Sequence, residues 1–139
     1  MPTQIFVNLP VKDLDRSVAF FTALGFTFNP QFTDKNATCM IISDSIFAML
    51  LVEPFFKTFT PRALCDATTH TEAILALSVE SKAKVDEMVG AALAAGGTEP
   101  RARTELGFMY NCAFADPDGH IWEIFWMDPA VVAGQPQNA

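Results

Sequence analysis

The chain has 139 residues, half of them hydrophobic, with 13 phenylalanines and a formal net charge of −7 at pH 7. This length suits one domain, or two small halves that share a core. The acidic balance argues against a nucleic-acid partner, and the lack of an apolar run of about 18–20 residues argues against a membrane span. No secretory signal is recognisable and the three cysteines are widely spaced, so we expect a cytoplasmic protein with reduced thiols.

The first half of the chain predicts a strand, a helix and three further strands. The helix begins at an N-cap on Asp13 and ends at Gly25, with apolar residues at helical spacing between them. A polar connection follows the last strand, with one helical turn expected near residues 62–67. The predicted strands cover residues 5–10, 26–32, 37–42 and 45–52.

The second half repeats this order. Ser81 caps a helix that runs to about Ala95 and stops at two glycines. Strand, helix and three strands, given twice with a period of roughly 65–70 residues, indicate an internal duplication. Residues 130–139 lack periodicity, and we interpret them as a flexible tail or one packed on a partner. The predicted strands cover residues 74–79, 98–104, 108–114 and 121–126.

The last strand follows a tight turn, Asp116-Pro117-Asp118-Gly119, in which proline fixes one backbone angle and glycine accepts a positive φ. Along the strand, Glu123 shares a face with Ile121 and Phe125. A carboxylate among apolar side chains is costly if that face is buried. Glu123 therefore needs a partner, a ligand or a raised pKa.

Two segments, residues 7–21 and the run from Asp116 to Glu123, make the chain similar to the vicinal oxygen chelate superfamily. This superfamily includes glyoxalase I, fosfomycin and bleomycin resistance proteins and extradiol dioxygenases. The resemblance covers about residues 4–128 and implies an α+β fold. It implies one domain, residues 1–129, in which two β-α-β-β-β modules (4–53 and 73–128) form a half-open barrel around a central cavity. It also implies a homodimer.

The resemblance further implies a divalent metal, Zn, Ni, Mn or Fe, held by residues from four strand positions. Three of those positions are apolar in this chain, and apolar side chains cannot coordinate a metal. We therefore expect the usual metal site to be absent and no cofactor to be bound. The four positions are Phe6, a residue near Leu50, Ile74 and Glu123.

Other residues are candidates for the cavity. Asn8 shares a face with Phe6 and could fix the orientation of a ligand. Tyr110, the only tyrosine, is placed at the cavity mouth, where it could hold a polar group, act as an acid or only pack. Phe125 shares the face of Glu123. The cluster Phe55-Phe56-x-x-Phe59 resembles a lid or a dimer contact.

Three functional hypotheses follow. In the first, the protein binds a small apolar or aromatic molecule without a metal, and Glu123 is a polar anchor. In the second, it is a metal-dependent glyoxalase or extradiol dioxygenase, with Glu123 as a ligand. In the third, Glu123 with a raised pKa performs metal-free acid/base catalysis, together with Tyr110.

Overall fold

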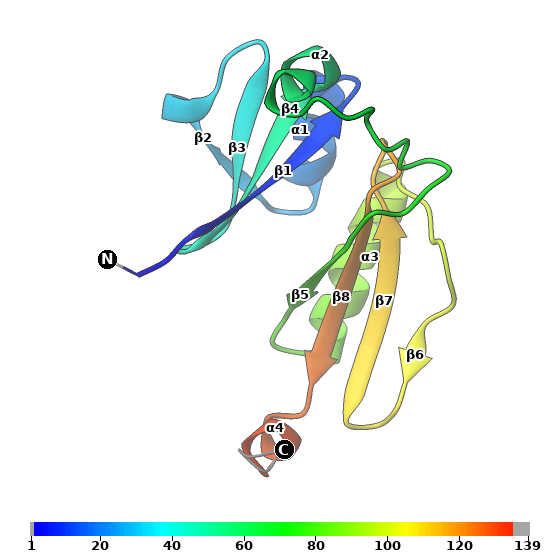
Figure 1. Cartoon of the computed structure of the whole chain (residues 1–139). Helices are drawn as coiled ribbons and strands as arrows, with labels where there is room; N and C mark the ends of the chain where they lie inside the picture. Colours follow the sequence, from blue (N-terminus) through cyan, green and yellow to red (C-terminus); the bar gives the residue numbers. More distant parts are fainter. Residues whose placement is uncertain (1, 135–139) are drawn as a thin grey trace. The chain divides into compact units, whose positions relative to one another are not determined.

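The computed structural model describes residues 2–134, and of residues 132–134 it describes the backbone. The chain divides into two compact units, Met1–His70 and Thr71–Ala139, each with one four-stranded sheet (Figure 1). The strand orders, β1-β4-β3-β2 and β5-β8-β7-β6, are equivalent. The predicted α+β class and the repeated β-α-β-β-β order are therefore confirmed.

The first unit is built around a mixed sheet. Strands β1 and β4 are parallel, while β4, β3 and β2 are antiparallel neighbours. Asp13 caps α1 by accepting a hydrogen bond from the backbone nitrogen of Arg16 at 3.1 Å, as its position predicts. The elements are β1 (Ile5–Val11), α1 (Leu14–Ala23), β2 (Thr27–Asn29), the 3₁₀ turn η1 (Pro30–Phe32), β3 (Ala37–Ser43), β4 (Ile46–Val52), α2 (Glu53–Phe56) and the 3₁₀ turn η2 (Lys57–Phe59).

Residues paired across neighbouring strands share a face, so the register decides which side chains lie against α1. Leu9 pairs with Leu50, and both are buried, as is Phe21 of α1. Phe6 pairs with Phe47 on the opposite face, where the two rings stack with centroids 4.7 Å apart. The first unit thus has a core face and a second apolar face with aromatic side chains.

The second unit repeats the plan. Strands β5 and β8 are parallel, and β8, β7 and β6 are antiparallel neighbours. Ser81 caps α3 as predicted, accepting from the backbone nitrogen of Lys84 at 3.0 Å. The elements are β5 (Ile74–Ser78), α3 (Lys82–Ala94), β6 (Thr104–Glu105), β7 (Met109–Ala115), β8 (Ile121–Met127) and α4 (Pro129–Gly134).

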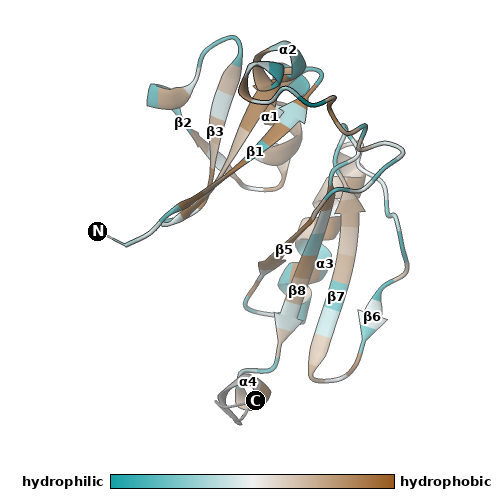
Figure 2. Ribbon diagram, viewed as in Figure 1, coloured by the Kyte–Doolittle hydropathy of each residue, from teal (hydrophilic) through white to brown (hydrophobic). Residues whose placement is uncertain are grey.

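The core of the second unit lies between α3 and one face of its sheet. Phe114 and Trp122 pair across β7 and β8, are almost fully buried and stack with ring centroids 6.4 Å apart. Val85 and Val89 of α3 are also fully buried. Figure 2 shows hydrophobic colours along most of β5 and β8, as a strand with a buried face requires.

The strand predicted at residues 98–104 is wrong for most of its length. Only β6 forms there, and Thr98 makes a single bridge to Ala115. Pro100 lies between them, and its missing N–H interrupts a hydrogen-bonded ladder. The segment therefore runs as a loop that is pinned at both ends.

Two other predicted elements differ. The helical turn expected at residues 62–67 is wrong, because the helical residues come earlier, in α2 and η2, directly after β4. The strand predicted at residues 26–32 is shorter, since Pro30 opens a 3₁₀ turn that Asn29 caps by accepting from the nitrogen of Gln31 at 2.9 Å.

The start of the predicted tail is ordered as a helix. Residues 129–134 form α4, and Asp128 accepts a hydrogen bond from the nitrogen of Ala130 at 2.9 Å. Residues 135–139 lie outside the described part of the chain. Between residues 2 and 134, no helix has the length and apolarity that a bilayer crossing requires. The closure of the two sheets into a half-open barrel stays a prediction.

Candidate functional site

Glu123 lies in the middle of β8 on the face of the second sheet opposite α3. Its neighbours across the sheet are Ala76 of β5 and Ala113 of β7. Two methyl side chains cannot cover a glutamate, and the Glu123 side chain keeps 23% of its surface exposed. Ile74 and Phe125 lie on the same face, one row away on either side, as predicted.

The partner of Glu123 is Arg101, which comes from the loop before β6. Its Nη2 donates to Glu123 Oε2 at 2.7 Å and to Asn111 Oδ1 at 2.5 Å. Asn111 completes the ring, since its Nδ2 donates to Glu123 Oε1 at 3.2 Å. Asn111 is 9% exposed and Arg101 has a side chain 37% exposed, so the ring lies partly in the sheet and partly at its surface.

This arrangement fixes the charge state of Glu123. The hydrogen bond from Arg101 is the main cause that lowers the pKa of the Glu123 carboxyl; Asn111 adds to it, and burial opposes it. This direction is opposite to the raised pKa that the third hypothesis expects. A carboxylate held ionised by a guanidinium is a good hydrogen-bond acceptor and a poor general acid.

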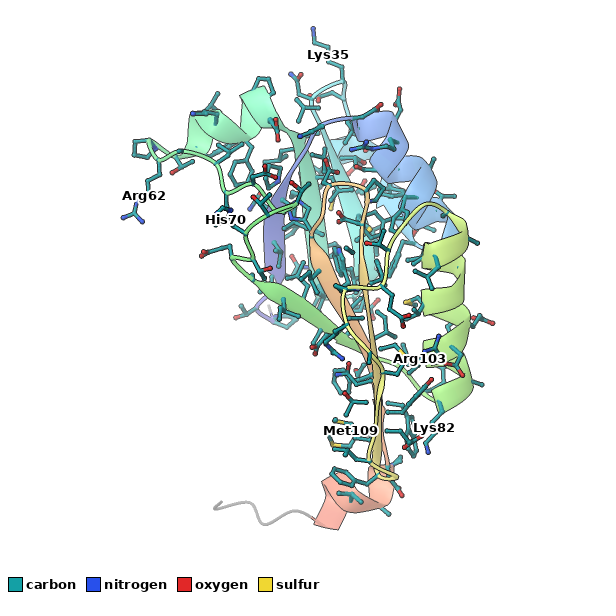
Figure 3. The ribbon with its side chains drawn as sticks, turned by 90° about the vertical axis from the view of Figure 1, so that its right-hand side faces the viewer. Lys35, Arg62, His70, Lys82, Arg103 and Met109 are labelled. Carbon is teal, nitrogen blue, oxygen red and sulfur yellow. The ribbon has the colours of Figure 1, made fainter. Side chains whose placement is uncertain are left out.

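Tyr110 lies on the other face of the second sheet. It pairs with Trp126, and its hydroxyl donates to Asp86 Oδ1 of α3 at 2.6 Å. Arg103 donates to both groups, at 2.8 Å to the hydroxyl and 2.6 Å to Asp86 (Figure 3 shows Arg103 beside α3). The expected cooperation of Tyr110 with Glu123 is wrong, because adjacent strand residues alternate faces and Asn111, not Tyr110, has the parity of Glu123.

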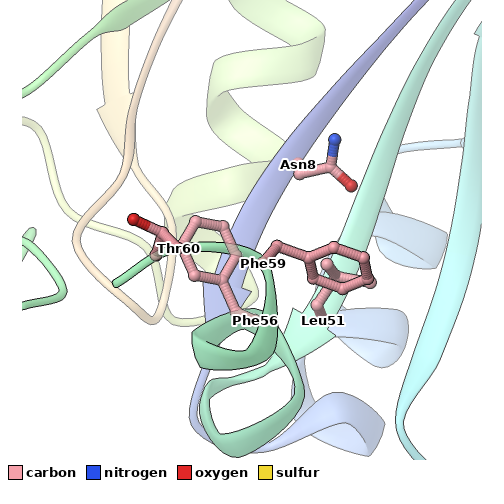
Figure 4. Close-up of a pocket in the computed structure, with 5 residues that line it drawn as sticks. All are labelled: Asn8, Leu51, Phe56, Phe59 and Thr60. Carbon is pink, nitrogen blue, oxygen red and sulfur yellow. The ribbon is translucent and has the colours of Figure 1, made fainter. Parts of the chain in front are cut away.

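A second candidate site lies in the first unit. A pocket of about 230 Å³ opens beside β1 and β4, and the segment after β4 forms its other wall (Figure 4). The predicted Asn8 and the aromatic cluster after Pro54 meet here, although nothing in the sequence linked them. The lining residues are Asn8, Leu51, Phe56, Phe59 and Thr60.

The register corrects one cavity residue. Leu50, which is expected in the cavity with a register uncertainty of one residue, pairs with Leu9 on the core face and is fully buried. Leu51, one residue later, shares the face of Asn8 and lines the pocket. A shift of one residue moves a side chain to the other face of a sheet, and the sequence alone could not exclude that shift.

The residues at the positions that the resemblance assigns to a metal do not fit one. Phe6 and Ile74 have no donor atom, and Leu50 is a core residue. Two oxygens on the Glu123 face, Glu123 Oε2 and Asn111 Oδ1, both accept from Arg101. In residues 2–134, no group of three or more His, Cys, Asp or Glu side chains is placed to hold a metal ion.

A buried carboxylate anchors the turn before β8. Asp116 Oδ1 accepts from the backbone nitrogens of Asp118 and His120 at 2.9 and 3.0 Å, and Oδ2 accepts from Trp122 Nε1 at 3.1 Å. Burial raises the pKa of the Asp116 carboxyl, while the nearby His120 and Trp122 oppose the rise. The predicted turn thus fixes the start of β8, and with it the position of Glu123 along the strand.

Sequence reasoning missed Arg101, Asn111, Leu51 and Thr60. A signal for Arg101 was present, because the loop before β6 contains arginines and a partner was one of the options left open for Glu123. Asn111 could have been found from its parity within β7. Thr60 follows an irregular segment and had no signal.

Comparisons with known proteins agree with this fold. Residues 3–43 match the family described as "Bleomycin resistance protein-like N-terminal". The hypothetical protein SA1046 from S. aureus has a solved structure that is 30% identical, with a TM-score of 0.76; the match covers 91% of this chain and 95% of that one.

Two further solved structures share the fold. A glyoxalase/bleomycin resistance protein/dioxygenase family enzyme from Burkholderia phytofirmans PsJN is 19% identical, with a TM-score of 0.74 and coverage of 91% of this chain and 99% of that one. The fosfomycin resistance protein FosX from Mesorhizobium loti is 12% identical, with a TM-score of 0.68 and coverage of 96% and 99%. No curated protein matches the chain.

Proposed function

The chain belongs to the vicinal oxygen chelate superfamily, and from this premise we propose that it binds a small, uncharged aromatic or apolar molecule without a metal. The observation that carries the proposal is the pocket of the first unit, whose walls are Leu51, Phe56 and Phe59. Its volume of about 230 Å³ exceeds that of the roughly 150 Å³ engineered apolar cavity known to bind benzene. A molecule of one ring with a short substituent suits this space.

The polar groups of the pocket favour a neutral ligand with a hydrogen-bond donor. Asn8 Nδ2 donates to the carbonyl of Phe6 at 3.3 Å, so the amide oxygen is the acceptor that this side chain can offer. That oxygen is an acceptor for a ligand hydroxyl or amide. None of the five lining residues is charged, so a buried ligand charge would have no partner there.

The chemistry around Glu123 supports binding rather than metal-dependent or acid/base catalysis. Arg101 holds the carboxylate ionised and fills its acceptor positions together with Asn111. Glu123 would then be a fixed polar group, not a proton carrier. The homodimer and the cytoplasmic location stay predictions.

The test is a titration of the amide NMR spectrum with p-cresol and, separately, with benzoate. We expect p-cresol to shift the signals of Asn8, Leu51 and Phe59, and benzoate to bind at least about tenfold more weakly because its charge is unpaired in the pocket. Phe59→Ala should weaken p-cresol binding by about tenfold, because the ligand loses the apolar contact with the Phe59 ring.

The matched control is Phe32→Ala, because Phe32 and Phe59 are both exposed aromatics, at 58% and 68%, and Phe32 is not among the pocket residues. It should leave p-cresol binding unchanged. If p-cresol moves no pocket signal, or if both variants weaken it equally, the pocket is not the binding site.

A further inference from the structure

The Nη2 atom of Arg101 is hydrogen-bonded to both Glu123 and Asn111 on one face of the second sheet. It lies 2.7 Å from Glu123 Oε2 and 2.5 Å from Asn111 Oδ1, and it donates one hydrogen to each. Divalent cations lie about 2.0–2.6 Å from oxygen ligands. The guanidinium nitrogen therefore stands close to where a cation bridging these two oxygens would stand.

Asn111 strengthens this assignment, because its orientation depends on Arg101. With its oxygen accepting from Arg101, its Nδ2 points at Glu123 Oε1 and donates at 3.2 Å. A metal would need the oxygen of Asn111, and in this ring that oxygen is already used. Both potential oxygen ligands are thus satisfied by a single amino group of one side chain.

We infer that Arg101 is the counter-ion of Glu123. Its guanidinium occupies the position at which a divalent cation would bind this carboxylate, and so keeps such cations out. The guanidinium supplies a positive charge that cannot be lost by deprotonation or by chelation. The flanking Ala76 and Ala113 leave room for a cation once the arginine side chain is gone. This inference does not depend on the pocket of the first unit.

The loop chemistry provides the matched control. Arg103, two residues further on, is similarly exposed, with 43% of its side chain accessible against 37% for Arg101. Its contacts are Asp86, Tyr110 and Glu99, not Glu123. Arg103→Ala removes the same charge from the same loop and leaves the ring around Glu123 intact.

The experiment uses Mn²⁺ as the probe and measures its paramagnetic broadening of amide signals in the full chain. In the wild type and in Arg103→Ala, we expect no broadening centred on Ala76, Ala113 and Glu123. In Arg101→Ala, the signals of these residues should broaden at Mn²⁺ concentrations at least about tenfold below any that broaden them in the wild type, since the positive charge that repels Mn²⁺ from the carboxylate has been removed. Arg101→Lys should keep Mn²⁺ out, because it restores the positive charge.

Chemical rescue separates this role from a merely structural one. Guanidinium at millimolar concentration should reverse the broadening in Arg101→Ala by refilling the site. The inference is overturned if Mn²⁺ broadens these signals in the wild type as strongly as in Arg101→Ala, or if Arg101→Ala gains no broadening while its remaining spectrum is native. Should Arg101→Ala fail to fold, Mn²⁺ broadening centred on Glu123 in the wild type or in Arg101→Lys would overturn the inference.

Discussion

Arg101 and Arg103 stand two residues apart in one loop, yet their guanidinium groups pair on opposite faces of the second sheet. Arg101 contacts Glu123 of β8, whereas Arg103 contacts Asp86 of α3. In a regular strand, residues i and i+2 point to the same side. The loop conformation before β6 is therefore what lets two neighbouring arginines serve two separate carboxylates.

Removal of the Glu123 charge should destabilise the protein. Glu123→Gln leaves Arg101 without its carboxylate partner, and we expect the free energy of unfolding to fall by about 1–2 kcal/mol, a value reduced by the partial exposure of the pair. Urea denaturation measures this change. Glu105→Gln, which breaks the exposed pair with Lys82, should have a much smaller effect. Equal stability of Glu123→Gln and wild type would contradict the pairing.

The same ion pair predicts a pH dependence. The folded-state pKa of Glu123 is lowered by Arg101, so its stabilisation is complete above the unfolded value of about 4.3 and is lost as the pH falls through the folded pKa. The stability difference between wild type and Glu123→Gln should therefore shrink from pH 6 towards pH 3. Urea titrations at several pH values test it, and a difference that grows on acidification would refute the sign.

Tyr110 should titrate late. Its hydrogen bond to Asp86 is the first cause that raises the pKa of the phenol to about 12. Because it is the only tyrosine, phenolate absorbance after a rapid pH jump reports this group alone. Asp86→Asn should lower the midpoint towards the ordinary value of about 10. A wild-type midpoint near 10 before unfolding would mean that the hydrogen bond is not formed.

The turn before β8 should depend on its buried carboxylate. Asp116→Ala removes the acceptor of three hydrogen bonds and leaves the Trp122 indole N–H unsatisfied, so we expect a loss of about 2–4 kcal/mol. Asp66→Ala is the control, since Asp66 makes a similar turn with Thr68 at the surface. Asp66→Ala should destabilise the protein much less than Asp116→Ala, because its turn is solvent-exposed. Calorimetric unfolding of both variants measures the contrast.

The sequence predicts the fold well because its signals are local. The caps at Asp13 and Ser81, the apolar spacing of the helices and the turn at Asp116 each act within a few residues, and all lie where expected. The failures are also local. The strand predicted at residues 98–104 is interrupted at Pro100, and the helical turn expected at residues 62–67 forms earlier, around Pro54.

The candidate sites were harder to predict because they depend on register and on loops. A register uncertainty of one residue in β4 led to Leu50 being named in place of Leu51. The assignment of Tyr110 overlooked that the next residue, Asn111, is the one on the face of Glu123. Arg101 reaches Glu123 from a segment that has no regular structure. A segment without a repeating hydrophobic pattern gives no indication of which residue such a side chain contacts.

The parallel pairing in each half has a consequence for synthesis of the chain. Strand β1 finds its neighbour only when β4 exists, because Val11 pairs with Val52, and β5 must wait in the same way for β8. On the ribosome, the first sheet can close once Val52 has emerged, before most of the second half has been translated. Until Ile121 and the residues after it follow, the edge of β5 stays unpaired, and this interval is when the nascent chain is most open to chaperones and to association with other chains.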